Sequence, residues 1–281
     1  MTYQQLWQPL TAVSDAAEAR AVARWLLEVC FGLTTTDVAC GEVERLQGAD
    51  LERLLQMQQR LLQGEPVQYV AGTALFGPRR FSVSPAVLIP RPETYELCLW
   101  IEETATHRAL SQRRILDVGT GSGCIACTLA LDLDSSELTA WDISAEALAV
   151  AALNADKLGA NVRFEQRDAL QATPSDKCLF DYIVSNPPYV CHSECTDMQP
   201  QVLHHEPHQA LFVPDDDPLR FYRAIARYAW GTLVSRGLLF FELNAAHAEA
   251  TSQLMQDMGY ADVELRHDQF GQPRFLKATH P

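Results

Sequence analysis

The spacing of apolar residues is helical in the first part of the chain. Before Gly64, apolar side chains recur at three- and four-residue spacing, as Val22, Leu26 and Val29 do, and this is typical of amphipathic helices. Ser14 is the expected N-cap of this helix, and Gly32 is its expected end. We therefore predict a helical domain over residues 1–64.

Short β-prone runs replace the helical spacing after Gly64. Pro66–Val70 and Arg80–Val83 are rich in β-branched and aromatic residues and flank the turn pair Gly77-Pro78. This pattern predicts a β-hairpin linker over residues 65–90.

The remaining chain alternates between apolar strand patterns and amphipathic helix patterns. Pro92 followed by Glu93 is a typical helix start. Strands are expected over 114–118, 137–142, 162–167, 180–185, 238–243, 262–267 and 274–278, with helices between most of them. This alternation predicts an α/β domain over residues 91–281 with a doubly wound parallel sheet. Residues 190–217 are expected to be irregular and, because of their length, functional.

A glycine-rich loop follows the first of these strands. It reads Gly119-Thr120-Gly121-Ser122-Gly123, and glycines there allow a sharp turn and close approach of a ligand. Asp142 closes the next strand, where a carboxylate can accept hydrogen bonds from both hydroxyls of a ribose. The glycine spacing differs from that of dinucleotide-binding loops. The pattern therefore favours a nucleoside cofactor without a pyrophosphate.

The strand over 180–185 ends in the tetrapeptide Asn186-Pro187-Pro188-Tyr189. Two successive prolines make this turn stiff and remove two N–H donors. The Asn186 side-chain oxygen and the Pro187 carbonyl can each accept one hydrogen bond from a planar –NH2 group, while Tyr189 stacks on it. The nitrogen lone pair would then face an electrophile. The plainer interpretation is a strand-terminating turn.

S-adenosylmethionine fits both motifs, since it is a nucleoside without a pyrophosphate and carries an electrophilic methyl group. Asp168 and Ala169, at the end of the third strand, are expected beside its adenine, although Asp168 suits a capping role in its own loop equally well. Asn186 stands at the junction of cofactor and substrate.

Composition narrows the class of protein and its compartment. The net charge of −14 argues against a duplex-DNA binder, which needs a basic face. No apolar run reaches membrane-spanning length and the N-terminus has no leader pattern, so we expect a soluble, cytoplasmic protein. Cys124–Cys127 and Cys191–Cys195 have tight spacings that a zinc site could use. We expect no metal, and free thiols in a reducing compartment.

Six segments of the chain resemble the HemK/PrmC-type glutamine N5-methyltransferases. They are Pro66–Tyr69, Leu88–Thr94, Asp117–Ile125, Asp142–Leu148, Asn186–Tyr189 and Glu206–Leu211. The resemblance implies a class I S-adenosylmethionine-dependent methyltransferase fold: a Rossmann-like, seven-stranded sheet whose last strand is antiparallel, with an N-terminal helical domain and a hairpin linker. The implied reaction methylates the glutamine of the Gly-Gly-Gln loop in class-1 peptide-chain release factors and leaves S-adenosylhomocysteine.

The resemblance also implies roles for individual residues. The implied cofactor-binding residues are Gly119, Thr120, Gly121, Ser122, Gly123, Asp142, Asp168, Ala169 and Asn186. The implied substrate-binding residues are Asn186, Pro187, Pro188, Tyr189, Glu206 and Pro207, of which Asn186, Pro187 and Tyr189 are the catalytic ones. The helical domain would contact the release factor.

Three departures from the family pattern leave the substrate open. Tyr95 replaces the final glutamate of Arg-Pro-Glu-Thr-Glu, Val213–Pro218 replaces a glycine-rich segment, and Glu242-Leu243-Asn244 replaces Glu-Ile-Gly. The alternatives are a ribosomal-protein glutamine methyltransferase, a nucleic-acid adenine-N6 or cytosine-N4 methyltransferase, and a cofactor-sensing module without turnover. Base methylation requires extrusion of the base and a basic surface, which the net charge disfavours.

Overall fold

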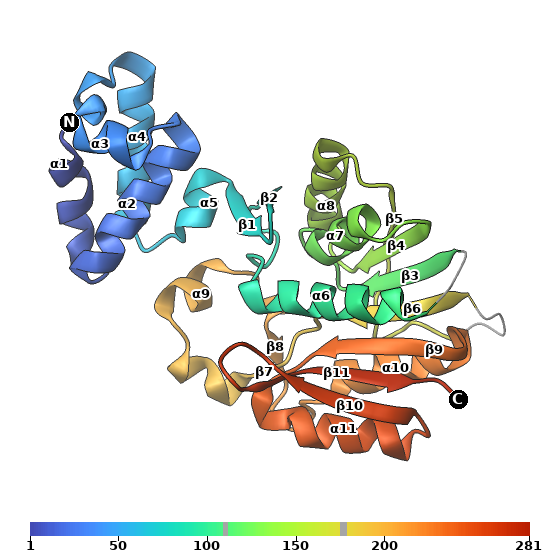
Figure 1. Cartoon of the computed structure of the whole chain (residues 1–281). Coiled ribbons are helices and arrows are strands. Elements are labelled where there is room, and N and C mark those ends of the chain that lie inside the picture. The colour runs from blue at the N-terminus through green and yellow to red at the C-terminus, as the bar shows by residue number, and fades with distance from the viewer. Residues whose placement is uncertain (109–111, 175–178) are drawn as a thin grey trace. The chain divides into compact units, whose positions relative to one another are not determined.

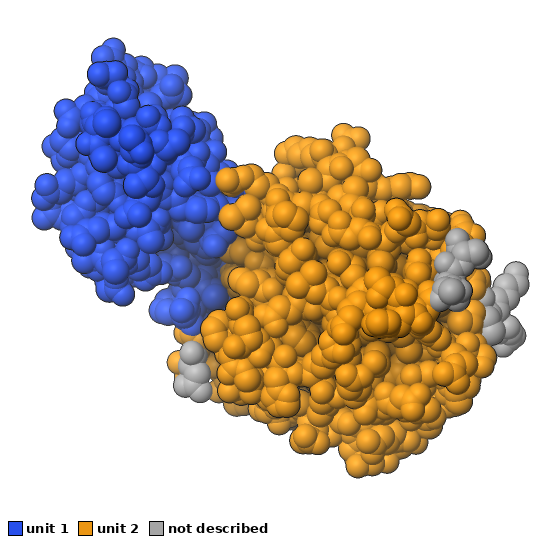
Figure 2. Space-filling model, in the orientation of Figure 1, with its two compact units in different colours: residues 1–73, 199–205 blue, residues 74–198, 206–281 orange. Residues whose placement is uncertain are grey.

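The chain folds into two compact units. The computed structural model describes residues 1–108, 112–174 and 179–281 (Figure 1). Unit 1 comprises residues 1–73 and 199–205, and unit 2 comprises residues 74–198 and 206–281 (Figure 2).

Unit 1 is helical, as the spacing of apolar residues predicts. Its α-helices are α1 (Tyr3–Trp7), α2 (Ala16–Phe31), α3 (Thr35–Ala39), α4 (Gly48–Leu62), α5 (Val67–Ala71) and α9 (Pro200–His205). α1, α2, α4 and α5 enclose an apolar core in which Leu6, Leu26 and Leu54 are fully buried. The predicted N-cap of α2 is wrong by one residue, because the carboxylate of Asp15 accepts hydrogen bonds from the Ala17 and Glu18 N–H groups at 2.8 and 2.9 Å.

The run Pro66–Val70 is helical, which corrects its prediction as β-structure. The Pro66 carbonyl accepts hydrogen bonds from the Tyr69 and Val70 N–H groups, both at 3.0 Å, and this starts α5. The apolar side chains that suggested a strand are buried by a single helical turn, and Gly72 ends it in a left-handed conformation. The hairpin itself is present, as β1 (Thr73–Phe76) and β2 (Arg79–Ser82).

Unit 2 is built on a seven-stranded sheet, and the predicted fold class is confirmed. The strands are β3 (Arg113–Val118), β4 (Ser136–Asp142), β5 (Val162–Gln166), β6 (Phe180–Ser185), β9 (Leu233–Glu242), β10 (Ala261–His267) and β11 (Pro273–Thr279). They lie in the order β10-β11-β9-β6-β3-β4-β5 (Figure 1). β11 pairs antiparallel with both of its neighbours, and the pairs from β9 through β6, β3 and β4 to β5 are parallel.

Helices cover both faces of this sheet, so its central strands are apolar on both sides. The helices are α6 (Pro92–Thr106), α7 (Cys124–Asp132), α8 (Ala145–Leu158), α10 (Arg220–Thr232) and α11 (Ala248–Asp257). In β6, Tyr182 and Val184 belong to one core cluster and Ile183 to the other. Phe240 and Phe241 of β9 divide in the same way.

Residues 190–217 are more ordered than predicted. They contain the parallel pair β7 (Val190–Cys191) and β8 (Phe212–Val213), the helix α9, and 3₁₀ turns over His192–Asp197 and His208–Ala210. None of these elements is long enough to give a periodic sequence signal. Within the described ranges, no helix is sufficiently long and apolar to cross a membrane.

Candidate active site

A cavity of about 520 Å³ lies at the carboxyl ends of β3, β4 and β6. This is the edge at which open α/β sheets bind ligands. Most of the residues singled out from the sequence line it: Gly119, Thr120, Gly121, Ser122, Asp142, Asp168, Ala169, Asn186, Pro187, Pro188 and Pro207. Gly123, Tyr189 and Glu206 are not among the described residues that line it.

The three glycines of the loop have two different roles. Gly119 and Gly121 have φ values of 76° and 54°, and a Cβ on either would meet no other protein atom within 4 Å. Since both line the cavity, the space beside their backbone is open to a ligand. A Cβ at Gly123 would instead lie 3.1 Å from the Cβ of Ala151, so this glycine allows α7 and α8 to pack closely.

Asp142 presents a carboxylate at the rim of the glycine loop. One carboxylate oxygen accepts a hydrogen bond from the Gly121 N–H and the other from the Ser144 N–H, each at 2.9 Å. Burial raises the pKa of Asp142, and these backbone hydrogen bonds oppose that effect. The Ile143 N–H also opposes this effect of burial, and since a carboxylate has about four lone-pair sites, at least one remains for a ligand hydroxyl.

Asp168 caps its own loop, as one of its two interpretations from sequence expects. Its carboxylate accepts hydrogen bonds from the Leu170 N–H and the Gln171 side chain, both at 2.8 Å.

Ile143 lines the same cavity with 44% of its surface exposed, and it offers an apolar face to a planar ring. Sequence reasoning missed Ile143, although it directly follows Asp142.

Asn186 and Pro187 line the cavity immediately after β6. The Asn186 Nδ2 donates a hydrogen bond to the Thr94 Oγ1 at 3.2 Å. The hydroxyl of Ser185 donates to the Val118 carbonyl at 2.6 Å, which ties the end of β6 to that of β3. The tetrapeptide and the glycine loop are therefore held side by side by the sheet itself.

Tyr189 and Glu206 make their contacts within the protein. The Tyr189 hydroxyl donates a hydrogen bond to the Glu242 Oε1 at 3.2 Å, and burial raises the pKa of Tyr189. The Glu206 carboxylate accepts a hydrogen bond from the Ile89 N–H at 3.1 Å and pairs with Arg91. Direct contact of these two residues with a substrate stays a prediction.

The cavity also includes residues that sequence reasoning gave no role. They are Leu88, Arg91, Thr94, Ile143, Arg167, Phe212, Arg220 and Phe221, among others. Thr94 lies in one of the segments that carry the family resemblance, and that segment was the available signal. Phe212, Arg220 and Phe221 come from β8 and α10, and nothing in their local sequence distinguishes them.

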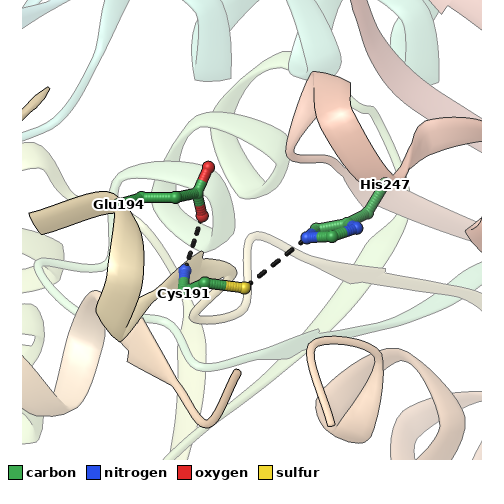
Figure 3. Close-up of side chains that lie close together, drawn as sticks. All are labelled: Cys191, Glu194 and His247. Atoms are coloured by element: carbon green, nitrogen blue, oxygen red, sulfur yellow. Dashed lines mark hydrogen bonds between the residues drawn. The ribbon is translucent and has the colours of Figure 1, made fainter. Parts of the chain in front are cut away.

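A separate cluster contains Cys191, Glu194 and His247 (Figure 3). The Cys191 Sγ lies 3.5 Å from the His247 Nε2, and Glu194 accepts a hydrogen bond from the Cys191 N–H at 2.6 Å. The Asn244 side chain donates to both Glu194 carboxylate oxygens, at 3.2 and 3.1 Å. These internal contacts connect Glu194 to β7 and to Asn244. The expectation of no metal stays a prediction.

Cys124 and Cys127 both lie on α7, where the sequence predicts a helix. Burial raises the pKa of each thiol to about 12. Thiols of this kind are not reactive at neutral pH.

Comparison with solved structures and family models defines the class of protein. The chain is similar to the catalytic domain of hMettl16, in a complex with MAT2A 3'UTR hairpin 6, with a TM-score of 0.55 and 16% identity over 81% of this chain and 80% of that one. It is also similar to a methyltransferase from Pyrococcus furiosus, with a TM-score of 0.52 and 18% identity over 80% and 98%. At these identities the similarity establishes the fold.

Residues 100–212 match the family model of the methyltransferase small domain, and residues 10–72 match that of the PrmC N-terminal domain. The protein is thus a methyltransferase with the class I fold.

Curated relatives identify the family within this class. Three proteins named release factor glutamine methyltransferase are similar over nearly their whole length. That of Bacteroides thetaiotaomicron is 41% identical over 97% of this chain and 96% of the relative. Those of Flavobacterium psychrophilum and Bacillus subtilis are 36% and 35% identical, over 98% and 95% of this chain and 96% and 93% of the relatives. The chain belongs to the release factor glutamine methyltransferase family.

Proposed function

We propose that this protein transfers a methyl group from S-adenosylmethionine to the side-chain amide nitrogen, N5, of the glutamine in the Gly-Gly-Gln loop of class-1 release factors. Family membership supports the substrate class. The observation that carries the chemistry is that one cavity brings Asn186 and Pro187 together with the glycine loop and Asp142.

The residues of this cavity fit S-adenosylmethionine. A volume of about 520 Å³ is within the usual range for cofactor sites. The open backbone at Gly119 and Gly121 leaves room for close approach, Asp142 retains a lone pair for a ribose hydroxyl, and Ile143 and Ala169 offer apolar surface to the adenine. When bound, the cofactor supplies a methyl group on a positively charged sulfur.

The tetrapeptide orients the glutamine. The Asn186 side-chain oxygen and the Pro187 carbonyl each accept one hydrogen of the substrate –NH2 group, which fixes the plane of the amide and the direction of its nitrogen lone pair. The two prolines hold these acceptors in place before the substrate arrives. Most of the acceleration comes from this orientation and from fixed dipoles. No strong base is needed, because the amide nitrogen becomes far more acidic as it gains the methyl group and would release its proton to water.

The protein partner is a release factor, and we place the reaction in the cytoplasm. All seven cysteines in the described part of the chain are free thiols, which a reducing compartment maintains.

The decisive experiment measures transfer of labelled methyl groups from S-adenosylmethionine to a purified class-1 release factor. A release factor with the loop glutamine replaced by alanine, ribosomal protein and nucleic acid run in parallel. We expect label on the intact release factor alone. Label on nucleic acid or ribosomal protein, with none on the release factor, would contradict the proposal.

Substitution of Asn186 tests the mechanism. Asn186→Ala removes one of the two acceptors, so we expect kcat to fall about a hundredfold or more while the Kd of the cofactor changes little. Asn161→Ala, at an exposed asparagine outside the described cavity lining, is the control and should retain full turnover. An Asn186→Ala enzyme with undiminished kcat would rule out this role of the side chain.

A further inference from the structure

The side-chain amide of Asn186 is connected to a buried carboxylate through one hydroxyl. The Asn186 Nδ2 donates to the Thr94 Oγ1 at 3.2 Å, and the Thr94 Oγ1 donates to the Glu242 Oε2 at 2.7 Å. Thr94 comes from the first turn of α6 and Glu242 from the last residue of β9. Their exposed fractions are only 3% and 2%. We call Asn186, Thr94 and Glu242 the amide relay.

Proton counting fixes the direction of this relay. A hydroxyl has a single hydrogen, and Thr94 donates its hydrogen to the Glu242 Oε2. Since the hydrogen of Thr94 is donated to Glu242, Thr94 presents only lone pairs to Asn186. The –NH2 group of Asn186 must therefore face Thr94, and the amide oxygen must face the other way.

The orientation of Asn186 matters because the proposed substrate group is itself a donor. Asn186 and Thr94 both line the cavity, so a flipped amide would present its own –NH2 group to the –NH2 group of glutamine. Two donors cannot form a hydrogen bond, and one substrate hydrogen would lose its acceptor. The relay thus decides whether the tetrapeptide can hold the substrate.

The other end of the relay is firmly anchored. The Tyr189 hydroxyl donates to the Glu242 Oε1 at 3.2 Å, and the Tyr222 hydroxyl donates to the Glu242 carbonyl at 3.1 Å. Burial raises the pKa of Glu242, and the hydrogen bond from Thr94 and the nearby positive charge of Arg274 oppose part of this rise. The Glu242 carboxyl group accepts one hydrogen bond at each of its two oxygens, from Thr94 and from Tyr189, and so links α6 and the tetrapeptide to β9.

We propose that Thr94 and Glu242 are positioning residues for methyl transfer, which act by fixing the Asn186 amide with its oxygen toward the substrate. This inference rests on the proposed function. It also gives Tyr189 a place in the reaction, because its hydroxyl donates to the Glu242 oxygen that Thr94 does not contact.

The test compares Thr94→Val with Thr94→Ser in the full-length protein. Valine has nearly the shape of threonine but no hydroxyl, whereas serine keeps the hydroxyl. We expect kcat on the release factor to fall about tenfold or more in Thr94→Val and to stay within about threefold of wild type in Thr94→Ser. The Kd of the cofactor should be unchanged in both. Thr94→Ala replaces the valine variant if that protein does not fold.

A double-mutant cycle separates positioning from a structural role. If Thr94 acts through Asn186, adding Thr94→Val to Asn186→Ala should cause no further loss of kcat. Losses that multiply in the double variant, or wild-type kcat in Thr94→Val alone, would overturn the relay and leave the proposed function intact. Failure of the wild-type protein to methylate the release factor would contradict both the amide relay and the proposed function. Failure of the relay alone is therefore distinguishable from failure of the proposed function.

Discussion

Asp117 is a carboxylate whose protonation is strongly altered by its place in the fold. It lies near the end of β3, is completely buried, and accepts a hydrogen bond from the Thr120 hydroxyl at 2.6 Å. Burial raises the pKa of Asp117 to about 7, and the Thr120 hydrogen bond opposes part of this shift. A group with such a pKa changes charge near neutral pH, so it makes the stability of the fold depend on pH.

The sign of this dependence follows from linkage. In the unfolded chain Asp117 loses its proton near pH 4, whereas in the folded protein it keeps the proton up to about pH 7. Its contribution to the free energy of unfolding is therefore greatest below about pH 4, falls as pH rises through this interval, and is constant above it. Asp117→Asn should remove this contribution to the slope, so the variant gains stability relative to wild type as pH rises from 5 to 8. Urea unfolding at several pH values measures the free energy of unfolding of both proteins. If its dependence on pH were the same for wild type and Asp117→Asn, the prediction would be contradicted.

At the scale of single residues, functional residues within one contiguous motif could be predicted from the sequence. Contacts between residues that are far apart in the sequence and that the sheet brings together could not. Asn186 and Pro187 could be predicted because the tetrapeptide is contiguous and chemically distinctive. The contacts of Thr94 with Asn186 and with Glu242 could not be predicted from the sequence. Thr94 lies 92 residues from Asn186 and 148 residues from Glu242 along the chain. Their proximity depends on the pairing of β9 with β6 and on the packing of α6 against β9.

At the scale of elements, long periodic segments were predictable and short ones were not. The strands of the sheet and their helices follow from the succession of short apolar runs and amphipathic helical patterns along the chain. The prediction of β-structure for Pro66–Val70 was wrong, because five residues can bury the same apolar side chains either as a strand or as one helical turn. The turns within 190–217 were missed for the same reason, since each is too short to show a period.

Close packing of α7 against α8 gives a prediction at this scale. Gly123 and Gly159 both have positive φ, 79° and 72°, so alanine at either position strains the backbone. A Cβ at Gly159 would meet nothing within 4 Å, whereas one at Gly123 would crowd Ala151. Gly159→Ala should lower the free energy of unfolding by about 1 kcal/mol, and Gly123→Ala by about 1 to 3 kcal/mol more. Denaturant titration measures both, and equal losses would show that α8 moves aside at no cost.

At the scale of the whole molecule, the two units have separate hydrophobic cores. The core of unit 1 is formed by α1, α2, α4 and α5 with the turns between them, while unit 2 has one core on each face of its sheet. All described residues that line the cavity belong to unit 2. Stability of the helical unit and affinity for the cofactor should therefore be separable.

Adjacent leucines on α4 provide a matched test of this separation. Leu54 is fully buried, and Leu55 has 42% of its surface exposed. Leu54→Ala should lower the free energy of unfolding of unit 1 by about 2 to 5 kcal/mol, and Leu55→Ala should change it by less than about 0.5 kcal/mol. The Kd of the cofactor should be unchanged in both, as measured by calorimetry. Weaker cofactor binding in folded Leu54→Ala protein would show that the units are coupled.

Unit 1 is not one continuous stretch of chain. Residues 199–205, which include α9, group with residues 1–73, although β7 and β8 on either side of them belong to unit 2. Recombination between related genes exchanges contiguous segments. A crossover near codon 73 would bring in a new N-terminal helical region and leave the inherited α9 behind. Unit 1 and unit 2 are therefore expected to diverge together by point substitutions. Exchange of the whole helical unit between related genes is not expected.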